Sequence, residues 1–420
     1  MPRKPALRQR TVPRSGIGLA LAGGGPLGAI YEIGALCALE EGIVGLDLNV
    51  LDGYVGVSAG AFVAAGLANG MTARQLCDAF IGDAGPRADR IDASLFFKPA
   101  WSELLLRLAK LPAALARAGA GYVSTQRSLL SSLEELGAVL PAGLFTQAPL
   151  QSHLQRIFTA PGRSDDFRTL KQRLVIVATD LDSGEAVPFG LPGWDHVPVS
   201  QAVVASAALP GLFPPLGIDG RWYVDGALKK TLHARVLLDR GLDLILCLNP
   251  LVPFDATHAK QHRVLGDAAQ PIPQMVRGGL PMVLSQTFRS LIHSRLELGM
   301  QGYATSHPGA DILLFEPDHR DPELFLANTF DYSRRQRLAE HAYQRTRAHL
   351  RSQRSTLGPL LARHGLGLND AALDDATRRL LPRSSGARRA GLQATPPAGA
   401  ALRRLEEVLD DLQRTLLARA

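Results

Sequence analysis

The sequence contains one serine whose neighbours are typical of a catalytic nucleophile. Ser58 lies in the run Val55-Gly56-Val57-Ser58-Ala59-Gly60, between an apolar segment predicted as a strand and one predicted as a helix. The small residues of a Gly-x-Ser-x-Gly turn permit a sharp strand-to-helix bend, which places the hydroxyl at the positive end of the helix. Such a serine needs a base that accepts its proton and N–H donors that stabilise an oxyanion.

A glycine-rich segment after the first predicted strand could supply these donors. It reads Gly23-Gly24-Gly25-Pro26-Leu27-Gly28 and satisfies the G-x-G-x-x-G pattern of dinucleotide sites. A nucleotide fold requires an acidic residue at the end of its second strand, where this chain has Gly56-Val57-Ser58. We therefore favour an oxyanion over a nucleotide phosphate as the anion that this loop binds, and a dinucleotide-dependent oxidoreductase is disfavoured.

Spacing alone leaves two kinds of base open for Ser58. A conventional hydrolase uses a histidine, and the candidates to be tested among the eleven in the chain are His196, His233, His258 and His293. Asp225 ends the segment Trp222-Tyr223-Val224 and is followed by two small residues, although a simple turn aspartate fits this spacing equally well. An aspartate with an unperturbed pKa of about 3.9 is a poor base, but burial would raise that pKa.

Apolar segments that alternate with helical patterns predict an α/β fold with a mostly parallel sheet covered on both faces. The first two turns of such a sheet lie at its carboxyl edge, which brings the glycine-rich loop close to Ser58. The predicted strands are Ile17–Ala22, Val50–Val57, Leu174–Thr179 with its hairpin partner Ala186–Phe189, Arg221–Val224, Leu242–Leu248 and Ile312–Phe315.

Taken together, these motifs resemble those of the patatin-like phospholipases. The motifs that carry the resemblance are Gly23–Gly28, Gly56–Gly60, Thr179–Glu185, Ala205–Pro210, Phe213–Pro215 and Asp225-Gly226-Ala227. The resemblance covers roughly residues 15–320 and implies a three-layer α/β/α fold with helical insertions. It also implies a catalytic dyad of Ser58 and Asp225. The oxyanion hole would be drawn from Gly23, Gly24, Gly25 and Gly28 and centred on the amides of Gly24 and Gly25. Leu27 and Ala227 depart from the commonest residues of the family, which are a basic residue and a glycine.

The resemblance implies a serine lipid acyl hydrolase that cleaves fatty-acyl esters of phospholipids or lysophospholipids. No cofactor is expected, and because no metal-ligand cluster is evident in the sequence, we expect full activity in the presence of a chelator. Two alternatives stay open. One is a protein that binds or scaffolds a lipid surface with little catalysis, and the other is a histidine-dependent α/β-hydrolase.

The remaining segments predict the organisation of the chain. We expect a basic tail at residues 1–14, a catalytic domain at 15–320 with a helical insertion at about 80–150, and a helical extension at 321–381. A flexible linker at 382–400 and an amphipathic helix at 401–420 follow, and heptad-spaced leucines at 402–416 suggest a homo-oligomer.

Composition restricts the partners and the compartment. The net charge of +7 favours an anionic lipid surface, and no nucleic-acid motif accompanies it. Cys37, Cys77 and Cys247 are isolated within apolar segments, which fits a reducing, cytoplasmic location with peripheral contact to membranes. We favour a core strand over a signal peptide near the N-terminus, and a strand–turn–helix over a membrane span at residues 53–73 because glycines interrupt that segment.

Overall fold

The computed structural model describes residues 15–82, 89–91, 95–96, 98–99, 142–257, 275–321, 323 and 334–381. The described residues as far as Leu380 belong to one compact unit. Four predicted features lie wholly or mostly outside the described residues: the basic tail at 1–14, the helical part of the 80–150 insertion, the linker at 382–400 and the helix at 401–420 with its leucines at 402–416.

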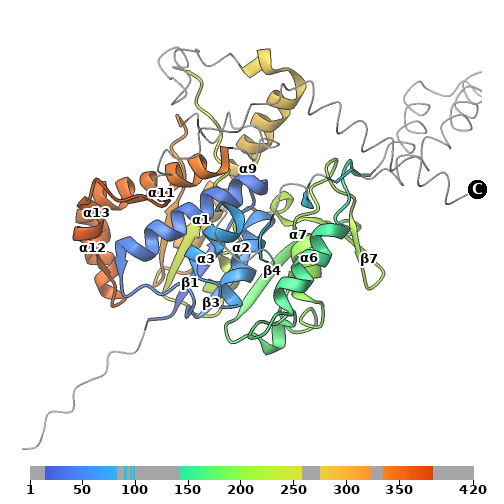
Figure 1. The fold of residues 1–420 in the computed structure, drawn as a ribbon, viewed down its shortest axis with the longest axis horizontal. Helices are drawn as coiled ribbons and strands as arrows, with labels where there is room; N and C mark the ends of the chain where they lie inside the picture. The colour runs from blue at the N-terminus through green and yellow to red at the C-terminus, as the bar shows by residue number, and fades with distance from the viewer. Residues whose placement is uncertain are drawn as a thin grey trace, which may run out of the picture. The chain divides into compact units, whose positions relative to one another are not determined.

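Eight strands form one sheet whose central part is parallel (Figure 1). Their order is β6-β7-β4-β3-β1-β8-β9, with β5 paired to β4. Strands β4, β3, β1, β8 and β9 are parallel to one another, whereas β5 and β7 run antiparallel to β4. The bounds are β1 Ile17–Leu21, β3 Gly53–Gly56, β4 Leu174–Asp180, β5 Ala186–Phe189, β6 Leu216–Ile218, β7 Arg221–Asp225, β8 Leu244–Leu248 and β9 Asp311–Phe315. The short strands β2 (Ile43–Val44) and β10 (Gly367–Leu368) form a separate antiparallel pair.

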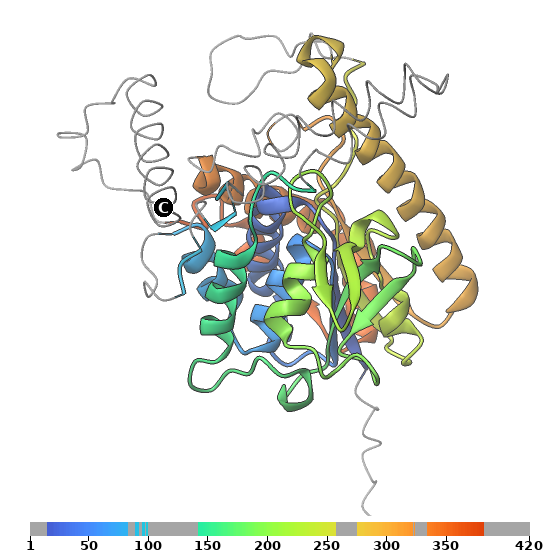
Figure 2. The same ribbon diagram turned by 90° about the vertical axis from the view of Figure 1, so that its right-hand side faces the viewer.

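Helices cover both faces of the sheet, which explains why its parallel strands are apolar along their length. All seven residues of β4 and all four of β3 are buried. Helices α1 (Gly25–Gly42), α2 (Ala59–Ala68) and α3 (Ala73–Phe80) lie on one side of the sheet, and the long helix α9 (Gly279–Ser306) lies on the other (Figure 2). The predicted α/β fold with a mostly parallel central sheet is confirmed.

The other helices complete these layers. On the α9 face, Leu237 of α8 and Leu296 of α9 join Ala20, Val55 and Cys247 of the sheet in one apolar cluster. The remaining helices in the described parts of the chain are α6 Ala148–Phe158, α7 Val199–Ser206, α8 Arg235–Leu238, α11 Arg335–Ser352, α12 Arg354–Arg363 and α13 Asp370–Asp374, with short 3-10 turns at η2 Phe167–Thr169, η3 Gly226–Leu228 and η4 Met275–Gly278.

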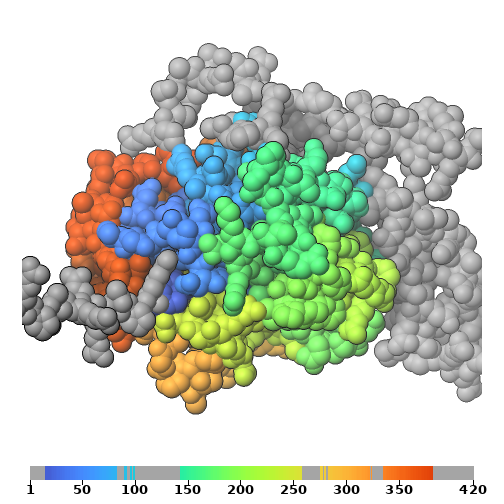
Figure 3. All heavy atoms as spheres, turned by 90° about the horizontal axis from the view of Figure 1, so that it is seen from below, coloured from blue at the N-terminus to red at the C-terminus, as the bar shows by residue number. Residues whose placement is uncertain are grey.

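The C-terminal helices pack against the first helix of the chain. Helix α11 approaches α1 so closely that a Cβ atom on Gly34 would lie 2.4 Å from the carbonyl oxygen of Ala339. The hydroxyl of Tyr343 also donates a 2.6 Å hydrogen bond to the Glu41 carboxylate. Figure 3 shows these C-terminal residues, in orange and red, beside the blue N-terminal ones. Residues 335–374 therefore help to hold α1, whose first turn is part of the glycine-rich loop.

Residues 53–73 form the predicted strand–turn–helix, with β3 and α2 joined at Ser58. Within the ranges that the structure describes, no helix is both long enough and apolar enough to cross a membrane.

Candidate active site

Ser58 occupies a strained turn between β3 and α2. Its φ of 51° and ψ of −117° lie in a region that non-glycine residues rarely adopt, as expected for a nucleophile turn. The turn is held against the neighbouring strand, because the N–H of Gly60 donates to the carbonyl of Ala22 (3.0 Å). A Cβ atom on Gly56 would lie 2.5 Å from the carbonyl oxygen of Gly60, and one on Gly60 would lie 2.6 Å from Leu21. Both glycines of the motif are therefore required by close backbone contacts.

Ser58 and Asp225 meet because β3, which precedes Ser58, and β7, which ends at Asp225, pair with the same edge of β4. β5 pairs with Ile176–Thr179 and occupies the other edge, which leaves β3 and β7 on the same side. β3 is parallel to β4 and ends with Gly56 opposite Ile176, whereas β7 is antiparallel and ends with Asp225 opposite Ala178. The carboxyl ends of these two strands therefore meet head to head, with the nucleophile turn beginning at their junction.

The side chains of Ser58 and Asp225 are in direct contact. The Ser58 hydroxyl donates a 2.6 Å hydrogen bond from Oγ to Oδ2 of Asp225. The other carboxylate oxygen, Oδ1, accepts the backbone N–H of Ala227 at 2.9 Å. Ser58 is 6% exposed and Asp225 is 3% exposed, so the pair is almost shielded from water. This arrangement holds an acceptor oxygen against the serine proton, as a general base requires.

Burial changes the acid–base chemistry of Asp225. Removal of the carboxylate from water raises its pKa to about 6, although the hydrogen bonds from Ser58 and Ala227 act in the opposite direction. A carboxylate with this pKa is ionised at neutral pH and is a stronger base than an exposed aspartate. The weakness of aspartate as a base, noted from the sequence, is thereby reduced.

The raised pKa predicts the pH dependence of ester hydrolysis. Asp225 accepts a proton only when it is ionised, so kcat/KM should fall about tenfold per pH unit below pH 6 and level off above it. The measurement is the pH–rate profile between pH 4.5 and 8 with a soluble short-chain ester. A profile that stays flat down to pH 4.5 would contradict the assignment, as would an apparent pKa that a histidine substitution abolishes.

Ser206, near the end of α7, positions the nucleophile turn. Its hydroxyl accepts the backbone N–H of Ser58 at 2.8 Å and donates to the carbonyl of Val177 in β4 at 2.6 Å. The side chain is fully buried, and it links the turn to the strand that also pairs with Asp225. The sequence placed Ser206 in a motif of the family resemblance but gave it no role.

The glycine-rich loop lies beside Ser58 and opens helix α1. A Cβ atom on Gly23 would lie 3.2 Å from Cβ of Ser58 and 3.7 Å from its Oγ, so a side chain at this position would crowd Ser58. Gly25 has a φ of 62°, and Gly28 donates to the carbonyl of Gly24 at 3.0 Å as the helix begins. The N–H groups of Gly24 and Gly25 have no acceptor among the residues that the structure describes. Within the predicted loop, these two amides are better candidates for an oxyanion than that of Gly28, which is already bonded.

Among the residues that the structure describes, none of the histidines proposed as alternative bases is hydrogen-bonded to Ser58. His196 is half-exposed and pairs with Asp219 at 2.8 Å, and His258 falls outside the described residues. Burial lowers the pKa of His233 to about 4. The hydroxyl of Ser58 bonds to Asp225, and no histidine in the described part of the chain shares a hydrogen bond with it. His293 faces a different group of side chains, described below.

Comparisons with known proteins found several solved structures that are similar to this chain. Solved structures similar to the chain include VipD from Legionella pneumophila, with 17% identity over 78% of this chain and 67% of VipD and a TM-score of 0.33. The type III effector protein ExoU shares 17% identity over 81% of this chain and 54% of its own, with a TM-score of 0.31. Human GIVD cytosolic phospholipase A2 shares 14% identity over 81% of this chain and 58% of its own, with a TM-score of 0.30. The chain thus spans little more than half the length of the last two.

A family model described as patatin-like phospholipase matches residues 19–238, which begin in β1, end in α8 and include Ser58 and Asp225. Because this match covers more than half of the chain, the protein belongs to the patatin-like phospholipases, a family of lipid acyl hydrolases.

Proposed function

We propose that this protein is a serine lipid acyl hydrolase that cleaves fatty-acyl esters of phospholipids or lysophospholipids with a Ser58–Asp225 dyad. The observation that carries the proposal is the 2.6 Å hydrogen bond from the Ser58 hydroxyl to the buried Asp225 carboxylate. The raised pKa of Asp225 and the adjacent amides of Gly24 and Gly25 support it. No step of the proposed reaction requires a cofactor.

The reaction proceeds through an acyl-enzyme. Ser58 Oγ attacks the ester carbonyl as its proton passes to Oδ2 of Asp225, and the N–H groups of Gly24 and Gly25 bind the tetrahedral oxyanion. When the oxyanion collapses, the ester C–O bond breaks and Asp225 returns the proton to the departing alcohol. Water then attacks the acyl-enzyme and gives its proton to Asp225. The fatty acid leaves, and Ser58 recovers its proton.

Labelling with a fluorophosphonate ester tests the proposal. The probe should modify Ser58, located by peptide mapping, and labelling should be lost in Ser58→Ala but retained in Ser183→Ala, which alters an exposed turn. A labelled protein would then be assayed with phospholipid, lysophospholipid and glyceride esters to define the substrate. Absence of any adduct on Ser58 would favour the lipid-scaffold alternative.

Helix α9 offers a surface for lipid contact, which we include in the proposed function as peripheral association. Four apolar residues that are exposed follow a spacing of four, four and three along the helix: Leu280, Leu284, Phe288 and Leu291. That spacing places them on one side of the helix, where they could enter the boundary between headgroups and acyl chains. The net charge of +7 would add attraction to anionic lipids.

We expect Leu284→Glu with Phe288→Glu to lower binding to vesicles of anionic phospholipid tenfold or more, because the carboxylates resist transfer from water. Binding would be measured by vesicle co-sedimentation. Val44→Glu is the matched control, since Val44 is an equally exposed apolar residue on β2. Hydrolysis of a soluble ester should be unchanged in both variants. Equal loss of binding in the control, or none in the α9 variant, would argue against this surface.

A further inference from the structure

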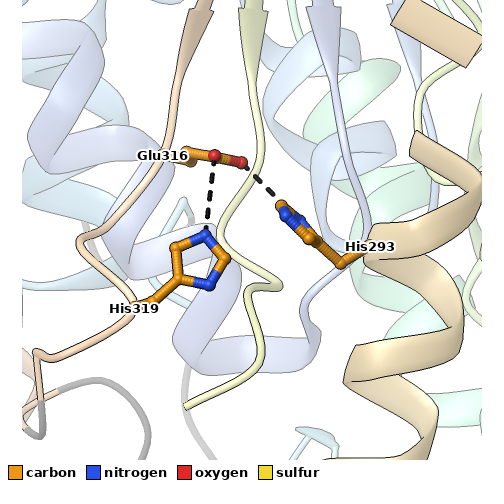
Figure 4. Close-up of side chains that lie close together, drawn as sticks. All are labelled: His293, Glu316 and His319. Carbon is orange, nitrogen blue, oxygen red and sulfur yellow. Dashed lines mark ion pairs between the residues drawn. The ribbon is translucent and has the colours of Figure 1, made fainter. Parts of the chain in front are cut away.

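Two histidines and a glutamate converge at the carboxyl edge of the sheet, separate from Ser58. His293 projects from α9, Glu316 directly follows β9, and His319 lies three residues further along (Figure 4). One nitrogen of each imidazole and one carboxylate oxygen all lie within 4.8 Å of one another. The two rings are nearly perpendicular, with an interplanar angle of 77° and centroids 4.7 Å apart, so they do not stack face to face.

The distances leave a gap that a bound ion would fill. Nδ1 of His293 is 4.0 Å from Oε2 of Glu316, and Nε2 of His319 is 3.9 Å from Oε1. Both separations are too long for a hydrogen bond. His293 is 9% exposed, and its Nδ1 is buried without a hydrogen-bond partner, although it points at this carboxylate. A buried ring nitrogen without a hydrogen-bond partner is costly, so a group bound between Nδ1 of His293 and the Glu316 carboxylate would stabilise the cluster.

Neighbouring side chains orient these groups as they do in metal sites. Nε2 of His293 lies 3.6 Å from the Glu297 carboxylate, one helical turn along α9, which is slightly beyond hydrogen-bond distance but places a negative charge behind the ring while Nδ1 faces Glu316. The amide of Asn249 donates to Oε2 of Glu316 at 3.2 Å and holds that carboxylate toward the histidines. In zinc sites, a histidine ligand often has a carboxylate next to its other ring nitrogen, and a carboxylate ligand often accepts a hydrogen bond from a neighbouring side chain.

We infer that His293, Glu316 and His319 bind a divalent zinc ion through Nδ1, the carboxylate and Nε2, with water in the fourth position. Two imidazoles and a carboxylate are a ligand set that Zn²⁺ prefers. A tetrahedral zinc ion with bonds of about 2.0–2.1 Å holds its ligand atoms about 3.4 Å apart, so ligand atoms that now lie within 4.8 Å of one another must approach by up to about 1.4 Å. His319 is 39% exposed in its side chain, which provides both the freedom to move and a path for the ion.

The position of the cluster gives such an ion a structural role. It would tie α9 to the segment after β9 and, through Asn249, to the end of β8. The next residue, Pro250, packs against the oxyanion loop, since a Cβ atom on Gly24 or Gly28 would lie 2.7 or 3.1 Å from its Cγ. The ion would therefore brace the strand ends beside the loop without contacting Ser58 or Asp225.

Calorimetric titration of chelator-treated protein with Zn²⁺ tests the inference. We expect one equivalent to bind and to raise the melting temperature. His319→Ala should weaken binding at least 100-fold, and Glu297→Gln about tenfold, because the second residue only orients a ligand. His196→Ala is the matched control, since His196 also pairs with a carboxylate but lies outside the cluster. The same variants would be titrated with Co²⁺, whose visible absorption reports nitrogen and oxygen ligands.

Fluorophosphonate labelling and ester hydrolysis provide a separate measurement, because the ion takes no part in the proposed reaction. Circular dichroism of each metal-free variant would show that it is folded. Absence of stoichiometric zinc binding by the folded protein would overturn the inference, with a water molecule then filling the gap. Undiminished binding in the His293→Ala, His319→Ala double variant would overturn it as well.

Discussion

Asp225→Asn should lower kcat for ester hydrolysis by about 10³-fold without unfolding the protein. Asparagine keeps the size of the side chain and can still accept the N–H of Ala227, which now bonds Oδ1 at 2.9 Å. An amide cannot accept the proton that Ser58 must lose, and general-base catalysis typically contributes about 10²–10⁴-fold. The Asp225 carboxylate accepts the Ser58 proton directly, so the dyad contains no second base that could take over this function.

Combining substitutions sharpens this test. Ser58→Ala should reduce hydrolysis to the same floor as Asp225→Asn, and the double variant should be no worse, because residues that act as a unit have non-additive effects. Asp219→Asn is the control, since it removes the charge of an exposed aspartate. Kinetics with a soluble ester and thermal melts would be measured on all four proteins. Near-normal turnover in Asp225→Asn would remove Asp225 from the reaction.

The sequence predicted the nucleophile turn and the glycine-rich loop because both follow strands that are close in the chain. Continuous apolar strands identified a parallel sheet, and that topology places the first two turns at one edge. The partner of Ser58 was harder to predict, since Asp225 is 167 residues away and its strand runs antiparallel to β4. Spacing contains no signal for strand direction, so the residues alone left histidine and aspartate open.

Two other features depended on tertiary contacts that no local pattern encodes. Ser206 holds the Ser58 amide through a single hydroxyl, and serines near helix ends are too common to single out. The group formed by His293, Glu316 and His319 joins a helix to a strand end, and only the Glu-x-x-His spacing of its last two members was visible in the sequence. Clusters assembled from distant elements become apparent only once the fold is known.

Gly226→Ala should separate Asp225 from Ser58 by displacing the backbone of the residue that follows Asp225. A Cβ atom at this position would lie 2.1 Å from the carbonyl oxygen of Val177 and 2.9 Å from its carbonyl carbon. These atoms belong to the buried strand β4, so they cannot turn aside as a flexible side chain would. The segment that carries Asp225 must therefore move, and the 2.6 Å contact with Ser58 would be lost.

We expect this single methyl group to reduce kcat/KM at least 100-fold and to lower the free energy of unfolding by about 1–3 kcal/mol, as overpacking does. Gly302→Ala is the matched control, because a Cβ atom there meets nothing within 4 Å and a helical alanine should stabilise α9 by about 0.5–1 kcal/mol. Denaturant unfolding and ester kinetics would be measured together. Normal stability and activity in Gly226→Ala would mean that β4 and β7 tolerate a displacement at their junction. The contact between Ser58 and Asp225 would then not depend on the close packing of Gly226 against Val177.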